Sequence, residues 1–155
     1  VLLLNGLGSI KLCDLGVSLP LADDLLSVRE PQLHVYEGTE SWRPPEALPH
    51  GVASPTAGGA LADDDSHGLQ VCDRSDVYAL GLVVWEMLTG EVPHADKARL
   101  GLHAFRAELG RAPELQPLPD GYRECEALFC WCTAHRPMQR PSAAQVLQAL
   151  GEWCC

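Results

Sequence analysis

An acidic residue that directly follows a predicted strand is the first candidate for chemistry in this sequence. Asp14 comes immediately after residues 9–13, whose alternation of polar and apolar side chains predicts a β-strand. A carboxylate at the end of a strand can hold Mg²⁺, which phosphoryl transfer uses to bridge phosphate oxygens. Gly16 gives the backbone freedom to turn sharply, positive φ included, so that the loop can leave without moving Asp14. Taken alone, an Asp at such a position is more often a turn residue.

Three further segments follow Asp14-Leu15-Gly16 in the chain. They run from Gly38 to Glu46, from Asp76 to Gly81, and from Arg140 to Ser142. In order and separation, the four segments resemble the C-terminal lobe of a eukaryotic protein kinase, beginning just after the catalytic loop. The stretch from Trp85 to His94 adds to a more specific resemblance, to kinases related to the mitogen-activated protein kinase kinases.

The resemblance implies roles for two residues in the transfer of phosphate from ATP. Asp14 corresponds to the carboxylate that holds magnesium against the ATP phosphates. Thr39 corresponds to the residue of Ser/Thr kinases that hydrogen-bonds the catalytic Asp and Lys. Leu15 stands where the family usually has Phe, and leucine keeps an apolar plug at that position.

The resemblance also implies supporting roles for three charged residues. Glu46 and Arg140 correspond to a buried ion pair, and breaking such a pair costs ~3–5 kcal/mol. Arg140 considered alone fits equally well as a solvated arginine before a helix. Asp76 corresponds to an Asp that hydrogen-bonds the backbone of the catalytic loop. A plain helix N-cap is the alternative for Asp76, and both roles can hold together.

Several hydroxyl groups lie in the predicted activation segment, residues 14–46. A phosphate on one of them could order the loop through an arginine such as Arg29 or Arg43. The sequence does not choose among the candidate phosphorylation sites, which are Ser18, Ser27, Tyr36 and Ser41.

The elements that must position these residues are one β-hairpin at the start, a long loop and then helices, and the resemblance implies that they form an α+β, protein-kinase-like fold with a mainly α-helical C-terminal lobe. Residues 1–4 form the first strand and Asn5-Gly6 its turn. A helix is expected at 76–88, apolar nearly all round and therefore buried on every side. Further helices are expected at 96–109 and 122–132, and after a capping box formed by Ser142 and Gln145. The 155 residues thus form one lobe, with a flexible insertion at 50–70 and a helical core at 76–153.

Composition excludes several classes of function. The net charge of −10 argues against a nucleic-acid partner and against an anionic membrane surface. The longest apolar run is too short to cross a membrane. Seven scattered cysteines favour reduced thiols and a cytoplasmic or nuclear location. Neither Cys130-x-Cys132 nor the acidic run Asp63–Asp65 has the spacing of a metal site.

The resemblance implies part of a protein serine/threonine kinase, of single or dual specificity, that uses ATP and Mg²⁺. Its expected substrates are Ser/Thr-containing proteins in mitotic or stress signalling, a mitogen-activated protein kinase among them. The chain ends Glu152-Trp153-Cys154-Cys155, which argues against a PDZ partner.

Two other readings compete with an active kinase. The glycine-rich loop, the ATP-anchoring Lys, the catalytic Asp and the second metal-binding Asn are expected upstream, so the 155 residues alone are predicted to be inactive. The first alternative is a pseudokinase-like interaction or scaffold module, and the second a free-standing acidic helical adaptor. An intact set of Asp14, Thr39, Glu46 and Arg140 argues against the first.

Overall fold

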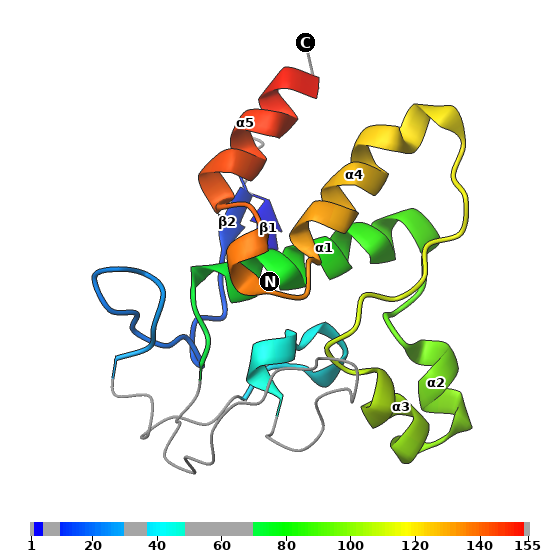
Figure 1. The fold of residues 1–155 in the computed structure, drawn as a ribbon, viewed down its shortest axis with the longest axis horizontal. Coiled ribbons are helices and arrows are strands. Elements are labelled where there is room, and N and C mark those ends of the chain that lie inside the picture. The colour runs from blue at the N-terminus through cyan, green and yellow to red at the C-terminus, as the bar shows by residue number, and fades with distance from the viewer. Residues whose placement is uncertain (1, 5–9, 30–36, 49–69, 154–155) are drawn as a thin grey trace.

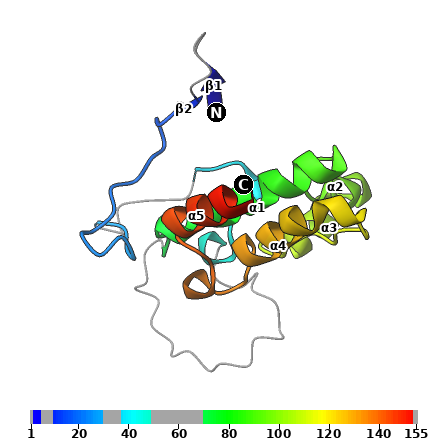
Figure 2. The same cartoon turned by 90° about the horizontal axis from the view of Figure 1, so that it is seen from above.

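The computed structural model describes residues 2–4, 10–29, 37–48 and 70–153. It opens with an antiparallel hairpin of β1 (Leu2–Leu4) and β2 (Ile10–Leu12), which confirms the predicted pair of strands. The predicted turn at residues 5 and 6 lies outside the described residues, and so does the predicted insertion at 50–70 except for its last residue. Figure 2 shows the hairpin lying away from the helices, and the side chain of Leu12 is accordingly 76% exposed.

Helices make up most of the remaining structure, as Figure 1 shows. In chain order they are the short 3₁₀ turns η2 (Glu40–Trp42) and η3 (Pro45–Ala47), then α1 (Asp73–Thr89), α2 (Ala95–Leu100), α3 (Leu102–Glu108), η4 (Asp120–Tyr122), α4 (Arg123–Cys132), η5 (Pro137–Gln139) and α5 (Ala143–Trp153). The predicted α+β class with a mainly helical lobe is therefore right. Among the described residues, no helix is long and apolar enough to span a membrane.

Two helix ends follow the local sequence signals closely, and two predicted ends were wrong. Gly90, at φ 72°, ends α1 in the left-handed conformation that favours glycine. Ser142 and Gln145 form the predicted capping box before α5, with bonds of 2.8 and 3.1 Å. The single helix predicted at 96–109 was wrong, because Gly101 adopts φ 116° and separates α2 from α3.

The start of α1 is the second predicted end that was wrong. The sequence predicted a start capped by Asp73, Ser75 or Asp76, but the helix begins at Asp73 with Cys72 as its N-cap. The backbone N–H of Cys72 donates to Ser75 Oγ at 3.0 Å, and the N–H of Asp73 donates to the carbonyl of Leu25 at 3.1 Å. A loop of the activation segment thus satisfies one of the backbone donors that a helix N-terminus leaves open.

The core forms where α1 packs against α4, and Val146 of α5 joins it; Figure 2 shows the three helices side by side. One cluster joins Val77, Leu128, Cys132 and Val146, and a second joins Tyr78, Leu82, Trp85 and Phe129. Helices α1 and α4 approach closely at Gly81, where an added Cβ would lie 2.7 Å from Thr133 Cγ2 and 2.8 Å from Cys132 Cβ. Glycine is needed at this position because no side chain fits between the helices.

One face of α1 is open, which corrects the prediction of burial on every side. Leu80, Val83 and Met87 are 41%, 37% and 79% exposed, while Val77, Tyr78 and Leu82 on the other face are almost fully buried. An apolar sequence shows how much of a helix can be buried, whereas neighbouring elements decide which face is covered.

Candidate functional site

A buried ion pair joins the end of the activation segment to the region before the last helix. Glu46 lies in η3, and Arg140 follows η5. Arg140 Nη1 is 2.7 Å from Glu46 Oε1, and Nη2 is 2.8 Å from Oε2, so the pairing is bidentate. The side chains are 0% and 10% exposed. The ion pair expected from the sequence is therefore present, and its acid and its base are 94 positions apart.

The guanidinium of Arg140 has all of its donors satisfied. Besides Glu46, it donates to three backbone carbonyls, those of Arg74 at 3.0 Å, Ala134 at 2.7 Å and His135 at 2.9 Å. An arginine side chain carries five N–H donors, and these contacts use every one. The arrangement ties together η3, the first turn of α1 and the loop before η5.

Sequence reasoning missed two side chains of this network. Ser75 Oγ donates to Glu46 Oε1 at 2.7 Å, and the Tyr78 ring lies 4.8 Å from Arg140 Cζ, a cation–π contact. Burial raises the pKa of the Tyr78 hydroxyl, and within the described residues that hydroxyl has no hydrogen-bond partner. Ser75 and Tyr78 are three positions apart and therefore share one face of α1. That this face lies against Arg140 is known only from the structure.

Asp14 lies just beyond β2, as the sequence predicted, in an exposed position. Its φ is 65°, whereas Gly16 does not have a positive φ. The chain does turn at Gly16, where the N–H of Ser18 donates to the carbonyl of Leu15 at 3.1 Å, but the positive φ occurs at the aspartate, a residue type that tolerates the left-handed region better than most. Leu15 is 67% exposed, so no described residue covers the predicted apolar plug.

Thr39 is the N-cap residue of η2, and its carbonyl accepts a bond of 3.3 Å from the N–H of Trp42. Its side chain is exposed and makes no capping hydrogen bond. The described residues therefore leave the Thr39 hydroxyl available, and its predicted contact with a catalytic Asp and Lys stays a prediction.

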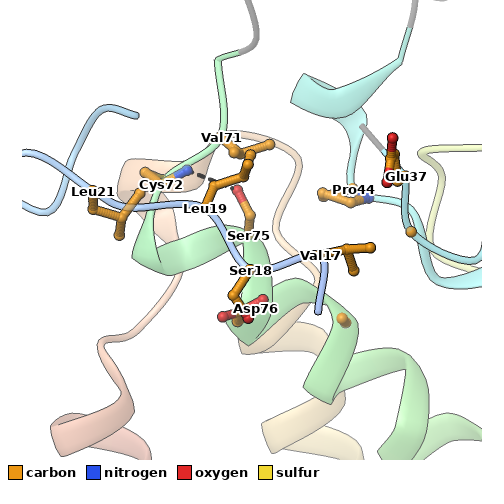
Figure 3. Close-up of a pocket in the computed structure, with 12 residues that line it drawn as sticks. Val17, Ser18, Leu19, Leu21, Glu37, Pro44, Val71, Cys72, Ser75 and Asp76 are labelled. Carbon is orange, nitrogen blue, oxygen red and sulfur yellow. Dashed lines mark hydrogen bonds between the residues drawn. The ribbon is translucent and has the colours of Figure 1, made fainter. Parts of the chain in front are cut away.

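Asp76 lies in a cavity of about 300 Å³ between the activation segment and the first turns of α1 (Figure 3). Ser18 and Leu19 line one side of it, and Pro44 and Ser75 line the others. Because Ser75 also bonds Glu46, this residue links the cavity to the buried ion pair. Asp14 and Thr39 are not among the lining residues. Asp76 keeps an exposed surface, yet partial burial, and then the charge of Asp73, raise the pKa of its carboxyl group.

The candidate phosphorylation sites differ in their surroundings. Ser27 is exposed, and its hydroxyl donates to Asp24 Oδ1 at 3.3 Å. Ser18 is exposed at the cavity, and Ser41 is half-buried in η2. Arg29 already pairs with Asp23 at 2.8 Å. Tyr36 lies outside the described residues.

The described residues contain no cluster of three or more His, Cys, Asp or Glu able to hold a metal by themselves. Magnesium in phosphoryl-transfer sites is instead held by one or two carboxylates together with substrate phosphates and water. The exposed carboxylate of Asp14 is a hard oxygen donor and suits Mg²⁺ in such a setting. Cys130 is exposed and Cys132 is buried, so these two thiols face different ways on α4.

Comparison with known proteins decides the family. A family profile described as the protein kinase domain matches residues 1–150, nearly the whole chain. The chain belongs to the protein kinase family. The β-hairpin and the helices described above are thus elements of a kinase domain.

The chain is similar to several curated kinases. It is 34% identical to the human lymphokine-activated killer T-cell-originated protein kinase over 92% of this chain and 43% of that protein. It is 31% identical to human mitogen-activated protein kinase kinase kinase 19 over 91% of this chain and 9% of that protein. It is 29% identical to the Xenopus laevis serine/threonine-protein kinase mos over 93% of this chain and 37% of that protein. This kinase chain therefore spans less than half the length of these relatives.

Proposed function

We propose that the protein containing this chain transfers the γ-phosphate of ATP to serine and threonine residues of protein substrates. The observation that carries the proposal is an intact Asp14 at the end of β2, in a chain that the kinase family profile matches over residues 1–150. The relatives named as serine/threonine kinases support the choice of acceptor residue. Phosphorylation of tyrosine as well would make the kinase dual-specific, and a phosphate-incorporation assay with serine, threonine and tyrosine substrates distinguishes the two cases.

Each residue of the site has a role in this proposal. Asp14 would hold Mg²⁺, and bound Mg²⁺–ATP would supply the phosphoryl group. Thr39 would hydrogen-bond the catalytic Asp and Lys, which the resemblance places upstream. The pair of Glu46 and Arg140 fixes the end of the activation segment against α1, where a peptide substrate would lie. Asp76 would hydrogen-bond the backbone of the catalytic loop in the cavity beside the activation segment.

We infer that the substrates include a member of a mitogen-activated protein kinase cascade, in mitotic or stress signalling. The names of two kinds of relative, the lymphokine-activated killer T-cell-originated kinase and the mitogen-activated protein kinase kinase kinases, support this inference. We also propose a location in the cytoplasm or nucleus, because scattered cysteines suit a reducing compartment.

The decisive experiment replaces Asp14 by Asn in the complete protein that contains this chain. Loss of a metal-binding carboxylate removes several kcal/mol of charge stabilisation, so phosphate incorporation should fall by about a hundredfold or more. Magnesium-dependent binding of a fluorescent ATP analogue should weaken in parallel. The matched control is Asp23→Asn, an aspartate in the same segment whose side chain is 98% exposed, and it should behave like the wild type.

Two results would count against the proposal. If Asp14→Asn changes neither nucleotide binding nor phosphate transfer, the pseudokinase-like scaffold becomes the better account. The 155-residue chain by itself is expected to transfer no phosphate, since the ATP-anchoring Lys and the catalytic Asp are expected upstream. Phosphate transfer by this chain alone would contradict the assignment of those roles.

A further inference from the structure

A second hollow lies far along α1 from the candidate active site. Its volume is about 730 Å³, and it is bounded by the C-terminal end of α1, by α2 and α3, and by residues 112–118. Figure 1 shows α2 and α3 at the end of α1 away from α5. None of the residues discussed as catalytic, metal-binding or phosphorylated lines this hollow, which we call the α1–α3 groove.

The floor of the α1–α3 groove is apolar and fixed in place. Trp85 is 7% exposed and its indole N–H donates to the carbonyl of Glu114 at 3.1 Å, which ties residues 112–118 to α1. Leu115 packs against the same core cluster, and Leu88 and Leu118 extend the apolar surface. A rigid apolar floor suits an apolar side chain of a partner, because the free protein already has the binding conformation and loses little conformational entropy on binding.

The wall beside α2 is also held firmly. His94 is 5% exposed at φ 62°, and its ring forms a hydrogen bond with the backbone of Arg111. Burial lowers the pKa of His94 more than the nearby Glu108 and Asp96 raise it, so the imidazole is neutral at physiological pH. His94 is thus a structural residue of the groove and adds no positive charge.

The rim of the groove is strongly acidic. Four carboxylates line it, those of Glu91, Asp96, Glu108 and Glu114, against the single ammonium group of Lys97. Lys97 already pairs with Asp96 at 3.1 Å, and the charges of Glu108 and Glu114 also act on it. Arg111 reaches Glu108 at 3.8 Å. Glu91 and Glu114 are exposed and form no ion pair within the described residues.

We propose that the α1–α3 groove docks a basic peptide segment of a protein partner, with an apolar side chain on Trp85 and Lys or Arg side chains at Glu91 and Glu114. Charge complementarity selects this occupant, because the unpaired carboxylates surround an apolar floor. An acidic or neutral apolar segment would leave those carboxylates without partners. This inference does not rest on the proposed catalytic activity, since docking requires neither ATP nor Asp14.

The test measures binding of a fluorescent peptide, Arg-Lys-Leu-Lys-Arg-Leu-Lys-Arg, to the full chain by fluorescence anisotropy. We expect saturable binding that weakens as salt is added, because the attraction is screened. The variant Glu91→Lys/Glu114→Lys should bind at least tenfold more weakly. The matched control Glu124→Lys/Glu126→Lys makes the same change of net charge on exposed residues of α4 outside the groove, and should stay within twofold of the wild type. Far-ultraviolet circular dichroism checks that both variants are folded.

Two comparison peptides test the chemistry of the occupant. Replacing both leucines by serine should weaken binding several-fold, and replacing the basic residues by glutamate should abolish it. The proposal is overturned if the wild type does not bind the basic peptide, if the acidic peptide binds equally well, or if both pairs of charge reversals weaken binding alike. Concentration-dependent dimerisation that Glu91→Lys/Glu114→Lys prevents, without peptide binding by the wild type, would instead assign the groove to a second copy of the chain.

Discussion

Replacing Arg140 by Met removes the guanidinium that links three separate parts of the kinase lobe. The wild-type side chain is fully buried and donates five hydrogen bonds, two of them to Glu46. Methionine fills a similar length of side chain without a donor. The carboxylate of Glu46 then keeps only its bond from Ser75, and three backbone carbonyls lose the donor that Arg140 gave them.

The expected loss of stability follows from this inventory. Breaking a buried ion pair by removing one partner costs about 3–5 kcal/mol, because the remaining charge stays buried. Glu46→Leu should cost a similar amount, since it leaves a buried guanidinium without its counter-ion. A typical domain has about 5–15 kcal/mol of stability in total, so either change removes a large share. In the double variant both charges are gone, and its loss should be smaller than the sum by about 1–3 kcal/mol.

Urea unfolding followed by tryptophan fluorescence measures these losses, because Trp42 and Trp85 pack in the core cluster beside Tyr78. The control breaks the exposed pair of Arg123 and Asp120, whose atoms are 2.6 Å apart but whose side chains are 75% and 91% exposed. Arg123→Ala should hardly move the unfolding midpoint. Losses below about 1 kcal/mol for both single variants, or strictly additive losses, would refute the argument that burial makes this ion pair important.

Two further predictions concern α1. Gly81→Ala should destabilise the lobe by about 1–3 kcal/mol, because the new Cβ meets Thr133 and Cys132 at under 3 Å. The control, Gly151→Ala in α5, meets nothing within 4 Å and should stabilise by about 0.5–1 kcal/mol. Equal effects of the two variants in urea unfolding would contradict the close approach of α1 and α4. Burial and Asp73 raise the pKa of Asp76, so the stability that protonated Asp76 provides at acid pH is lost as the pH rises through its folded-state pKa. Asp76→Asn should therefore raise the urea midpoint at neutral pH and lose that advantage below its ordinary pKa of 3.8, and a pH-independent difference would disprove the desolvation of Asp76.

Local signals predicted some element boundaries. The capping box of Ser142 and Gln145 and the left-handed Gly90 each act within a few residues, so their effect can be read directly from the sequence. The same reasoning failed at Gly101, which breaks a helix that amphipathicity alone would continue. It also failed at Cys72, where Ser75 and the carbonyl of Leu25 satisfy the first turn in place of a conventional capping residue.

The residues of the candidate site were likewise only partly predicted from the sequence. Glu46 and Arg140 were found through their place in kinase-like segments, because residue types and order carry that information. Ser75, Tyr78 and the three carbonyls around Arg140 were not found, since backbone groups look alike in every sequence. The positive φ of Asp14, just before the turn at Gly16, depends on how the chain leaves β2, which spacing does not reveal.

The sequence by itself determined the family, the main helical segments and the pair of residues that anchors the activation segment. These features depend on side-chain type and on interactions between residues close in the chain. Only the tertiary structure decided which face of α1 is covered, how Arg140 meets Glu46 and the carbonyl of Arg74, and that Trp85 and Glu114 share a groove. Such contacts join residues from about thirty to more than ninety positions apart, so they exist only once the path of the whole chain is set.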